Sequence, residues 1–266
     1  MGDWAYNMEN SGSSVGNAFM NAIQPFAATH PVQPVEGNHE KCGSCAGVPA
    51  AGVPSGNFSE YNARMYSVGA FGAGKTSGTG TPRYYSFNRG LTHFLVFTAE
   101  AYTYNSGAAF TSRQLAFMKA DLAAVDRKVT PWVVGLVHKA WWMEANAYAD
   151  FTPVLIEGKV DIVFTGHYHY YSRYKPYNNV TGDVDEAAIS ADGATYTNPK
   201  YMTVIITGAS GDKETDSPYD KPFPSCAFDP PPPRLFSPRQ ATTRSHTPSS
   251  LPSLPFLGRH GHAELR

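Results

Sequence analysis

Imidazole side chains follow the ends of apolar segments in this chain. His138 comes directly after WVVGLV, and His167 and His169 follow VDIVFTG. A third segment, VEGNHE, contains Asn38 and His39 near its end. In α/β proteins, ligand sites form at the carboxyl ends of strands, so these side chains are expected to converge. One such histidine is more readily a structural residue. Because four of the six histidines outside the C-terminal tail occupy these positions, a shared site is the better interpretation.

This mixture of ligand types predicts a particular kind of metal chemistry. Imidazoles suit zinc and iron, whereas carboxylate and amide oxygens suit harder ions. A site that mixes them suggests a hydrolytic metal pair, in which two ions activate a water and hold the displaced oxygens. Such a pair needs a bridging carboxylate, and Asp3 in GDWAY is available, with Tyr6 three residues further on.

Alternating apolar segments and helical patterns predict the elements that position these residues. We expect a helix over residues 16–30, a strand over 31–37, a long loop over 41–82 and a hairpin over 83–100. A helix over 111–128, capped by Ser112, precedes three buried strands within 132–138, 160–167 and 201–211. The fold class is therefore α/β.

Composition limits the classes of protein that the chain could represent. Hydrophobic residues make up 42% of the 266 residues, which is enough for a hydrophobic core. The net charge of −1 gives no argument for a nucleic-acid partner. No apolar stretch predicts a membrane span or a signal peptide. Residues 229–266 hold eight of the 21 prolines and show no periodicity, so we expect a folded domain over 1–228 and a disordered tail.

The cysteines and sequons add little. Cys42 and Cys45 form a single CxxC in a loop-like segment, which predicts a disulfide or two idle thiols rather than a zinc site. Asn57 and Asn179 stand in glycosylation sequons, which matter only in a secreted protein.

In combination, the motifs resemble those of the purple acid phosphatases, which are calcineurin-like metallophosphoesterases. Gly2-Asp3 with Tyr6, Gly37-Asn38-His39-Glu40, Val137-His138 and Gly166-His167-Tyr168-His169 stand in that family's order, and the likeness runs from about residue 2 to 211. The resemblance implies a layered α/β sandwich. It also implies hydrolysis of phosphate monoesters by a metal-bound hydroxide at acidic pH, in a secreted or vacuolar glycoprotein.

The resemblance also implies roles for individual residues. The expected centre contains Fe³⁺ and a divalent ion, which is Zn²⁺, Mn²⁺ or Fe²⁺. The implied metal ligands are Asp3, Tyr6, Asn38, His138, His167 and His169. Asp3 would bridge the ions, and Tyr6 with His169 would bind the ferric ion. His39 would be the catalytic contact to the substrate phosphate, next to Asn38. Glu40 is either an orienting residue or a solvated charge.

The chain departs from the family pattern in two respects. It lacks the earlier Asp-x-Gly motif, so we expect a truncated and incomplete domain. Residues 139–166 contain no histidine to protonate the leaving group, for which Glu144 and His93 are the substitutes. Two rival functions follow: an impaired fragment that binds one metal or a partner without turnover, and another metallophosphoesterase, such as a phosphodiesterase or nuclease. Tyr6 argues against the second of these. The sequence leaves the oligomeric state open.

Overall fold

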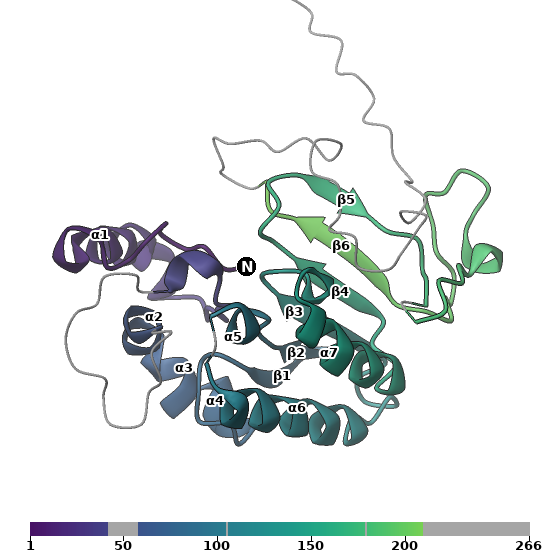
Figure 1. Ribbon diagram of the computed structural model, residues 1–266, viewed down its shortest axis with the longest axis horizontal. Coiled ribbons are helices and arrows are strands. Elements are labelled where there is room, and N and C mark those ends of the chain that lie inside the picture. Colours follow the sequence, from purple (N-terminus) through teal and green to yellow (C-terminus); the bar gives the residue numbers. More distant parts are fainter. Residues whose placement is uncertain (42–57, 105, 179, 210–266) are drawn as a thin grey trace, which may run out of the picture. The chain divides into compact units, whose positions relative to one another are not determined.

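A six-stranded mixed sheet is the centre of the fold in the computed structural model, which describes residues 1–41, 58–104, 106–178 and 180–209. Its strand order is β1-β2-β3-β4-β6-β5 (Figure 1). The strands are β1 (Tyr85–Arg89), β2 (Thr92–Val96), β3 (Trp132–Val137), β4 (Ile162–Thr165), β5 (Tyr171–Arg173) and β6 (Thr203–Thr207). The predicted hairpin and the three predicted buried strands are therefore confirmed.

Parallel pairing brings the carboxyl ends of the central strands to one edge of the sheet. β2, β3, β4 and β6 are parallel neighbours, and only β1 and β5, at the two sides, run antiparallel to their partners. Val137 pairs with Thr165, so the residues that follow β3 and β4 leave the sheet side by side. This register places His138 next to the segment that carries His167 and His169.

Apolar side chains cover both faces of the sheet, because successive strand residues point to opposite sides. One face packs against α6 (Ala108–Ala123) and α7 (Ala145–Glu157), which lie along the same side of the sheet in Figure 1. Leu95, Val133 and Val163 are fully buried there together with Met118 of α6 and Phe151 of α7. A smaller cluster on the opposite face contains Val35, Ala73, Tyr85 and Val96.

The helices differ from the predicted ones mainly at their ends. α1 (Asn10–Ala27) begins earlier than expected and contains a kink at residues 11–13, where φ is positive. α6 also begins earlier, because Gly107 adopts a φ of 90° and precedes the first turn; the predicted cap Ser112 lies inside the helix and was wrong. Short helical segments that the sequence did not predict include α5 (Glu100–Thr103), η1 (Asn38–Glu40), η2 (Trp141–Met143) and η3 (Glu186–Ala188).

Two predicted elements were wrong. Residues 31–37 do not form a strand, since Pro31 and Pro34 lack an N–H donor; the carbonyls of Pro34 and Val35 accept side-chain donors instead. The predicted loop 41–82 contains α2 (Ser59–Arg64), α3 (Tyr66–Ala70) and α4 (Ala73–Thr76). Phe58, Tyr61 and Met65 recur at helical spacing and form a buried cluster with Met8. Burial of these large side chains stabilises the helical segment despite the many small residues around it.

All described residues belong to the first of the two units into which the chain divides, Met1–Phe236. The predicted boundary at 229, the tail, the CxxC and both sequon asparagines lie outside the described residues. Among the helices that the structure describes, none is long and apolar enough to cross a bilayer.

Candidate metal centre

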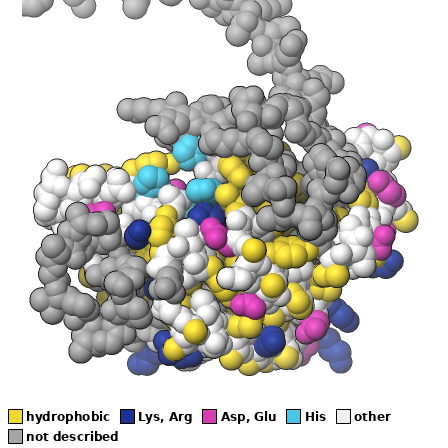
Figure 2. Space-filling view, in the orientation of Figure 1, with side chains coloured by type: hydrophobic (Ala, Val, Ile, Leu, Met, Phe, Trp, Pro, Cys, Tyr) yellow, Lys and Arg dark blue, Asp and Glu magenta, His cyan; other side chains and the backbone are white. Residues whose placement is uncertain are grey.

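Four predicted ligands converge at the carboxyl edge of the sheet. The Asn38 Oδ1 atom lies 3.0 Å from His138 Nε2 and 2.8 Å from His167 Nδ1. The Asp3 Oδ2 atom lies 3.0 Å from the same His138 nitrogen. These side chains come from the N-terminal segment, η1, the end of β3 and the turn after β4. Figure 2 shows histidine side chains gathered on one face, with basic and acidic side chains next to them.

The donor set fits a metal ion. One ligand atom from each of Asp3, His138 and His167 lies within 4.8 Å of the others. Atoms bound at about 2.0–2.2 Å to one tetrahedral ion would lie roughly 3.4 Å apart, so the observed separations need little change to accept one. The Asn38 amide oxygen completes a set of two nitrogens and two oxygens, which suits Zn²⁺ or a similar divalent ion.

Tyr6 and His169 form a second, neighbouring pair. The Tyr6 hydroxyl lies 2.7 Å from His169 Nε2, although residues 6 and 169 are far apart in sequence. His39 connects the two groups: its ring stacks on Tyr6 at a centroid distance of 4.1 Å, and its backbone N–H donates to Asp3 Oδ1 at 2.9 Å. The structure therefore brings together the six residues that the sequence proposed as metal ligands, with His39 between them.

Glu40 holds the backbone of two segments of the site through hydrogen bonds. It is fully buried, and the backbone N–H groups of Asp3, Trp4 and Gly37 each donate to its carboxylate at 2.7 Å. Burial and the charge of Asp3 raise the pKa of Glu40 to about 7, while these three hydrogen bonds oppose the rise. The interpretation of Glu40 as a solvated charge was wrong. Its carboxylate attaches the Asp3 segment to the loop that carries Asn38.

A buried ion pair that the sequence analysis missed supports the same loop. Glu36, two residues before Asn38, accepts two hydrogen bonds from the Arg83 guanidinium, at 2.6 and 2.8 Å, and one from Thr98 at 2.6 Å. The Arg83 guanidinium also lies 4.2 Å from the ring centroids of Phe58 and Phe110. A Glu and an Arg separated by 47 residues leave no periodic signal, so only the fold could reveal this pair.

Two glycines allow the segments of the site to approach closely. A Cβ atom on Gly37 would lie 2.3 Å from Asp3 Oδ1 and 2.5 Å from the Asp3 backbone nitrogen. A Cβ atom on Gly2, where φ is +73°, would lie 2.4 Å from His138 Nδ1. Any larger side chain at either position would overlap a residue of the site. This overlap explains why GDWAY and EGNHE contain glycine at these positions.

Uncommon backbone conformations concentrate at the site. Among the non-glycine residues that the structure describes, positive φ angles occur at Asp3 (51°), Tyr6 (43°), Asn7 (77°) and His167 (66°), and at four positions elsewhere. Asn, Asp and His adopt left-handed backbone more readily than other non-glycine residues, so the cost is greatest at Tyr6, and such backbone persists where surrounding contacts over-determine it. Here the contacts are those of the site itself, which is typical of functional positions.

The protonation preferences follow from burial and neighbouring charge. Burial acts to raise the pKa of Asp3, but the hydrogen bond and charge of His138 hold it below its ordinary value. Burial acts to lower the pKa of His138, but Asp3 outweighs this effect and raises it. Burial and the positive charges of His138 and Lys139 lower the pKa of His167 to about 4. Since metals bind neutral imidazole, the lowered pKa of His167 favours the form that binds an ion, and the raised pKa of His138 opposes it.

His93 does not reach the site, so the suggestion that it protonates a leaving group was wrong. It lies near the start of β2, where it pairs with Val133 at the amino end of β3. His138 follows the carboxyl end of β3, so the two histidines lie at opposite ends of the strands. Its ring nitrogens lie 2.7 Å from Asn88 Oδ1 and 2.9 Å from Asp121 Oδ2. This buried polar group joins the hairpin to α6.

Residues 69–76, GAFGAGKT, match the spacing of a nucleotide-phosphate loop, which the structure excludes as a working motif. The first glycine of the motif, Gly69, lies inside helix α3, whereas such a loop follows a strand. The amides of Phe71 and Gly72 both donate to the Ser67 carbonyl, and the amide and hydroxyl of Thr76 donate to Gly72. These groups are therefore not available to surround a phosphate.

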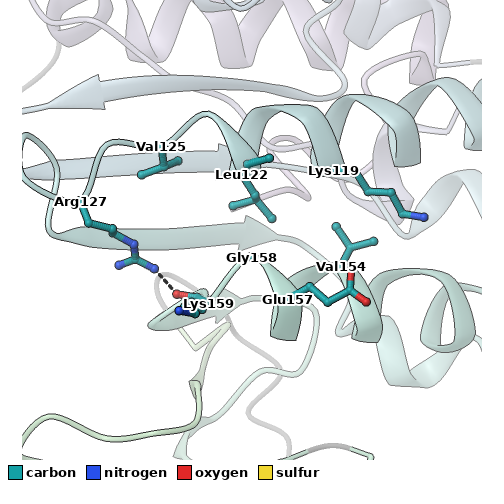
Figure 3. Close-up of a pocket in the computed structure, with 9 residues that line it drawn as sticks. Lys119, Leu122, Val125, Arg127, Val154, Glu157, Gly158 and Lys159 are labelled. Atoms are coloured by element: carbon teal, nitrogen blue, oxygen red, sulfur yellow. Dashed lines mark hydrogen bonds between the residues drawn. The ribbon is translucent and has the colours of Figure 1, made fainter.

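A pocket of about 340 Å³ lies between α6 and α7 (Figure 3). Leu122, Val125 and Val154 contribute apolar side chains to it. The Arg127 guanidinium at its rim is already paired with Asp161, at 2.6 Å, and with the Lys159 carbonyl. The pocket lies near the amino ends of β3 and β4 and contains no histidine, so it is not the predicted site.

Comparison with known proteins identifies the family. The family model described as calcineurin-like phosphoesterase matches residues 1–171, a range that includes all the converging residues. The chain belongs to the calcineurin-like phosphoesterase family. The recognition made from the motifs is confirmed at this level.

Individual relatives of this chain are purple acid phosphatases and acid phosphatases. Purple acid phosphatase 23 from Arabidopsis thaliana is 34% identical over 169 residues, covering 60% of this chain and 33% of the relative. Acid phosphatase type 7 from Mus musculus is 28% identical, covering 84% and 50%. The chain thus spans between a third and a half of these relatives.

A solved structure supports the fold. Purple acid phosphatase PPD1 from yellow lupin seeds matches with a TM-score of 0.52 at 21% identity, covering 83% of this chain and 38% of that one. At this identity the likeness bears on the fold alone, and it confirms the mixed α/β fold class.

Proposed function

We propose that this phosphoesterase is a metal-dependent acid phosphatase that hydrolyses phosphate monoesters at a dinuclear centre. The observation that carries the proposal is the convergence of Asp3, Asn38, His138 and His167 beside the Tyr6–His169 pair. The names of the relatives support phosphate monoesters as the substrate class. The proposed metals are Fe³⁺, held by Tyr6 and His169, and Zn²⁺, Mn²⁺ or Fe²⁺, held by the four converging residues.

The chain's own residues would bind and orient the substrate. Two ions at this site would supply an activated water and offset charge on the phosphoryl oxygens. His39 Nδ1 lies 3.2 Å from Asn7 Oδ1, which leaves Nε2 for the substrate. His39 would contact a phosphate oxygen through Nε2. The stacked Tyr6 ring holds the imidazole plane in place.

Metal analysis and turnover of the full chain, loaded with iron and zinc, test the proposal. We expect two ions per chain and hydrolysis of p-nitrophenyl phosphate at mildly acidic pH. His138→Ala should lose the divalent ion and the activity. His30→Ala is the matched control, because that exposed histidine stacks on Phe26, outside the site. Equal metal content in wild type and His138→Ala would contradict the ligand assignment.

One observation favours a second candidate, a chain that binds a single ion without turnover. Among the residues that the structure describes, one group of three His, Cys, Asp or Glu side chains is close enough to hold an ion, and it consists of Asp3, His138 and His167. Tyr6 and His169 instead contact each other directly. One ion per chain and no hydrolysis would identify this candidate.

We also propose a secreted or vacuolar location, supported by family resemblance and by the sequons at Asn57 and Asn179. A mass decrease on glycosidase treatment of the protein from its native cells tests this proposal. An unchanged mass would contradict it.

A further inference from the structure

A buried polar cluster lies directly behind His138. Lys139, the next residue, has a side chain only 8% exposed, and its ammonium nitrogen lies 3.5 Å from Glu100 Oε2 and 3.4 Å from Glu144 Oε1. The ammonium also donates to the Thr103 hydroxyl at 3.1 Å. The Thr103 hydroxyl in turn donates to Glu144 at 2.6 Å, which closes the cluster.

Glu100 depends on this lysine. Its side chain is fully buried, and neither carboxylate oxygen accepts a hydrogen bond from the residues that the structure describes. Burial raises the pKa of Glu100 to about 7, and Lys139 opposes that rise. A buried carboxylate without a partner is costly, so the position of Lys139 is strongly constrained by Glu100.

The cluster connects three elements around the loop that leaves β3. Glu100 and Thr103 are the first and last residues of α5, and Glu144 immediately precedes α7. Lys139, which directly follows His138, therefore links the end of β3 to both helices. The His138 ring is also held on its outer side, where Nδ1 lies 2.8 Å from the Met1 carbonyl oxygen.

We propose that Lys139 is a positioning residue, whose ammonium group, held by Glu100, Thr103 and Glu144, fixes the loop that aims His138 at Asp3 and Asn38. This inference rests on the proposed function in that it takes His138 as a metal ligand. Lys139 itself does not bind the ion. Side chains that orient a ligand from behind commonly change metal affinity 10–100-fold when replaced.

The first measurement follows His138 in the full chain without added metal. Imidazole ¹⁵N–¹H spectra, with the His138 signals assigned through His138→Ala, report how firmly the ring is held. We expect Lys139→Met to shift and broaden these signals and Lys139→Arg to preserve them. Lys175→Met is the matched control, because Lys175 pairs with Glu186 at 2.6 Å in an ion pair outside the site.

The second measurement is Mn²⁺ binding, followed by the electron paramagnetic resonance of free Mn²⁺. We expect the affinity of Lys139→Met to fall about 10–100-fold and that of Lys139→Arg to stay near wild type. The double variant Glu100→Gln/Lys139→Met removes the unpaired buried charge, so it should fold even if Lys139→Met does not. Its Mn²⁺ affinity should remain low, because the anchor is still missing.

The outcomes separate this inference from the proposed function. Wild-type His138 signals and Mn²⁺ affinity in the folded double variant would overturn the positioning role. A wild-type chain that binds no Mn²⁺ would instead defeat the metal site, while the metal-free His138 signals would still decide whether Lys139 positions the ring.

Discussion

Gly37→Ala is the substitution that most directly tests the geometry of the site. The backbone at residue 37 has φ −119° and ψ −178°, a conformation that alanine adopts without strain. The new Cβ atom would nevertheless lie 2.3 Å from Asp3 Oδ1 and 2.5 Å from the Asp3 nitrogen. Since the second of these is a backbone atom, a rotamer change cannot relieve the contact. The segment that carries Asp3 must move.

Two effects set the size of the change. Overpacking costs about 1–3 kcal/mol. Loss of the hydrogen bond from the His39 N–H to the Asp3 carboxylate adds about 1.5–3 kcal/mol, because the acceptor is charged. Together they amount to about 2.5–6 kcal/mol. A value near the lower end, about 3 kcal/mol, corresponds to a decrease in melting temperature of roughly 6–12 °C for a domain of this size.

The assay combines thermal unfolding with metal analysis of the full chain. Gly37→Ala should melt at a lower temperature and lose the ion held by Asp3, Asn38, His138 and His167. Gly12→Ala is the control: φ there is +63° with no atom within 4 Å of the new Cβ, so it carries backbone strain of about 1–2 kcal/mol but no clash. A Gly37→Ala protein with wild-type melting temperature and metal content would refute the close approach of Asp3.

Three further substitutions test the charges and the colour of the site. Arg83→Met leaves Glu36 buried without its cation and should lower the free energy of unfolding by about 3–5 kcal/mol in urea titrations; an unchanged midpoint would show that the pair is not needed. Burial raises the pKa of Glu100 from 4.5 to about 7, so its contribution to stability is complete below pH 4.5 and is lost as the pH rises through 7. Glu100→Gln should therefore match wild type at pH 4 and exceed it at pH 8 by an amount on the order of 2 kcal/mol, and parallel pH profiles would contradict this. Tyr6→Phe should abolish a broad visible absorption band of the iron-loaded chain without altering its circular dichroism, and a purple variant would exclude Tyr6 as the iron ligand.

The sequence by itself determined five of the six strands, β1 to β4 and β6, and the identity of the converging residues. Apolar runs ending at His138 and His167 predict buried strands because a strand covered on both faces has no room for polar side chains. Parallel neighbours bring their carboxyl ends to one edge, so convergence followed from local patterns. The order of the motifs was sufficient to recognise the family.

Tertiary structure alone decided what holds those residues in place. Glu40 is next to His39 in the sequence, yet its burial under three backbone amides depends on the Asp3 segment passing above it. The Glu36–Arg83 pair and the Lys139 cluster join residues from separate elements, and charge–charge contacts between distant segments have no periodicity. Residues 31–37 read as a strand because strand propensity is local, whereas pairing requires a neighbour with free donors and acceptors. Sequence patterns record which face of an element is buried, but partners across the core are chosen only when the elements pack.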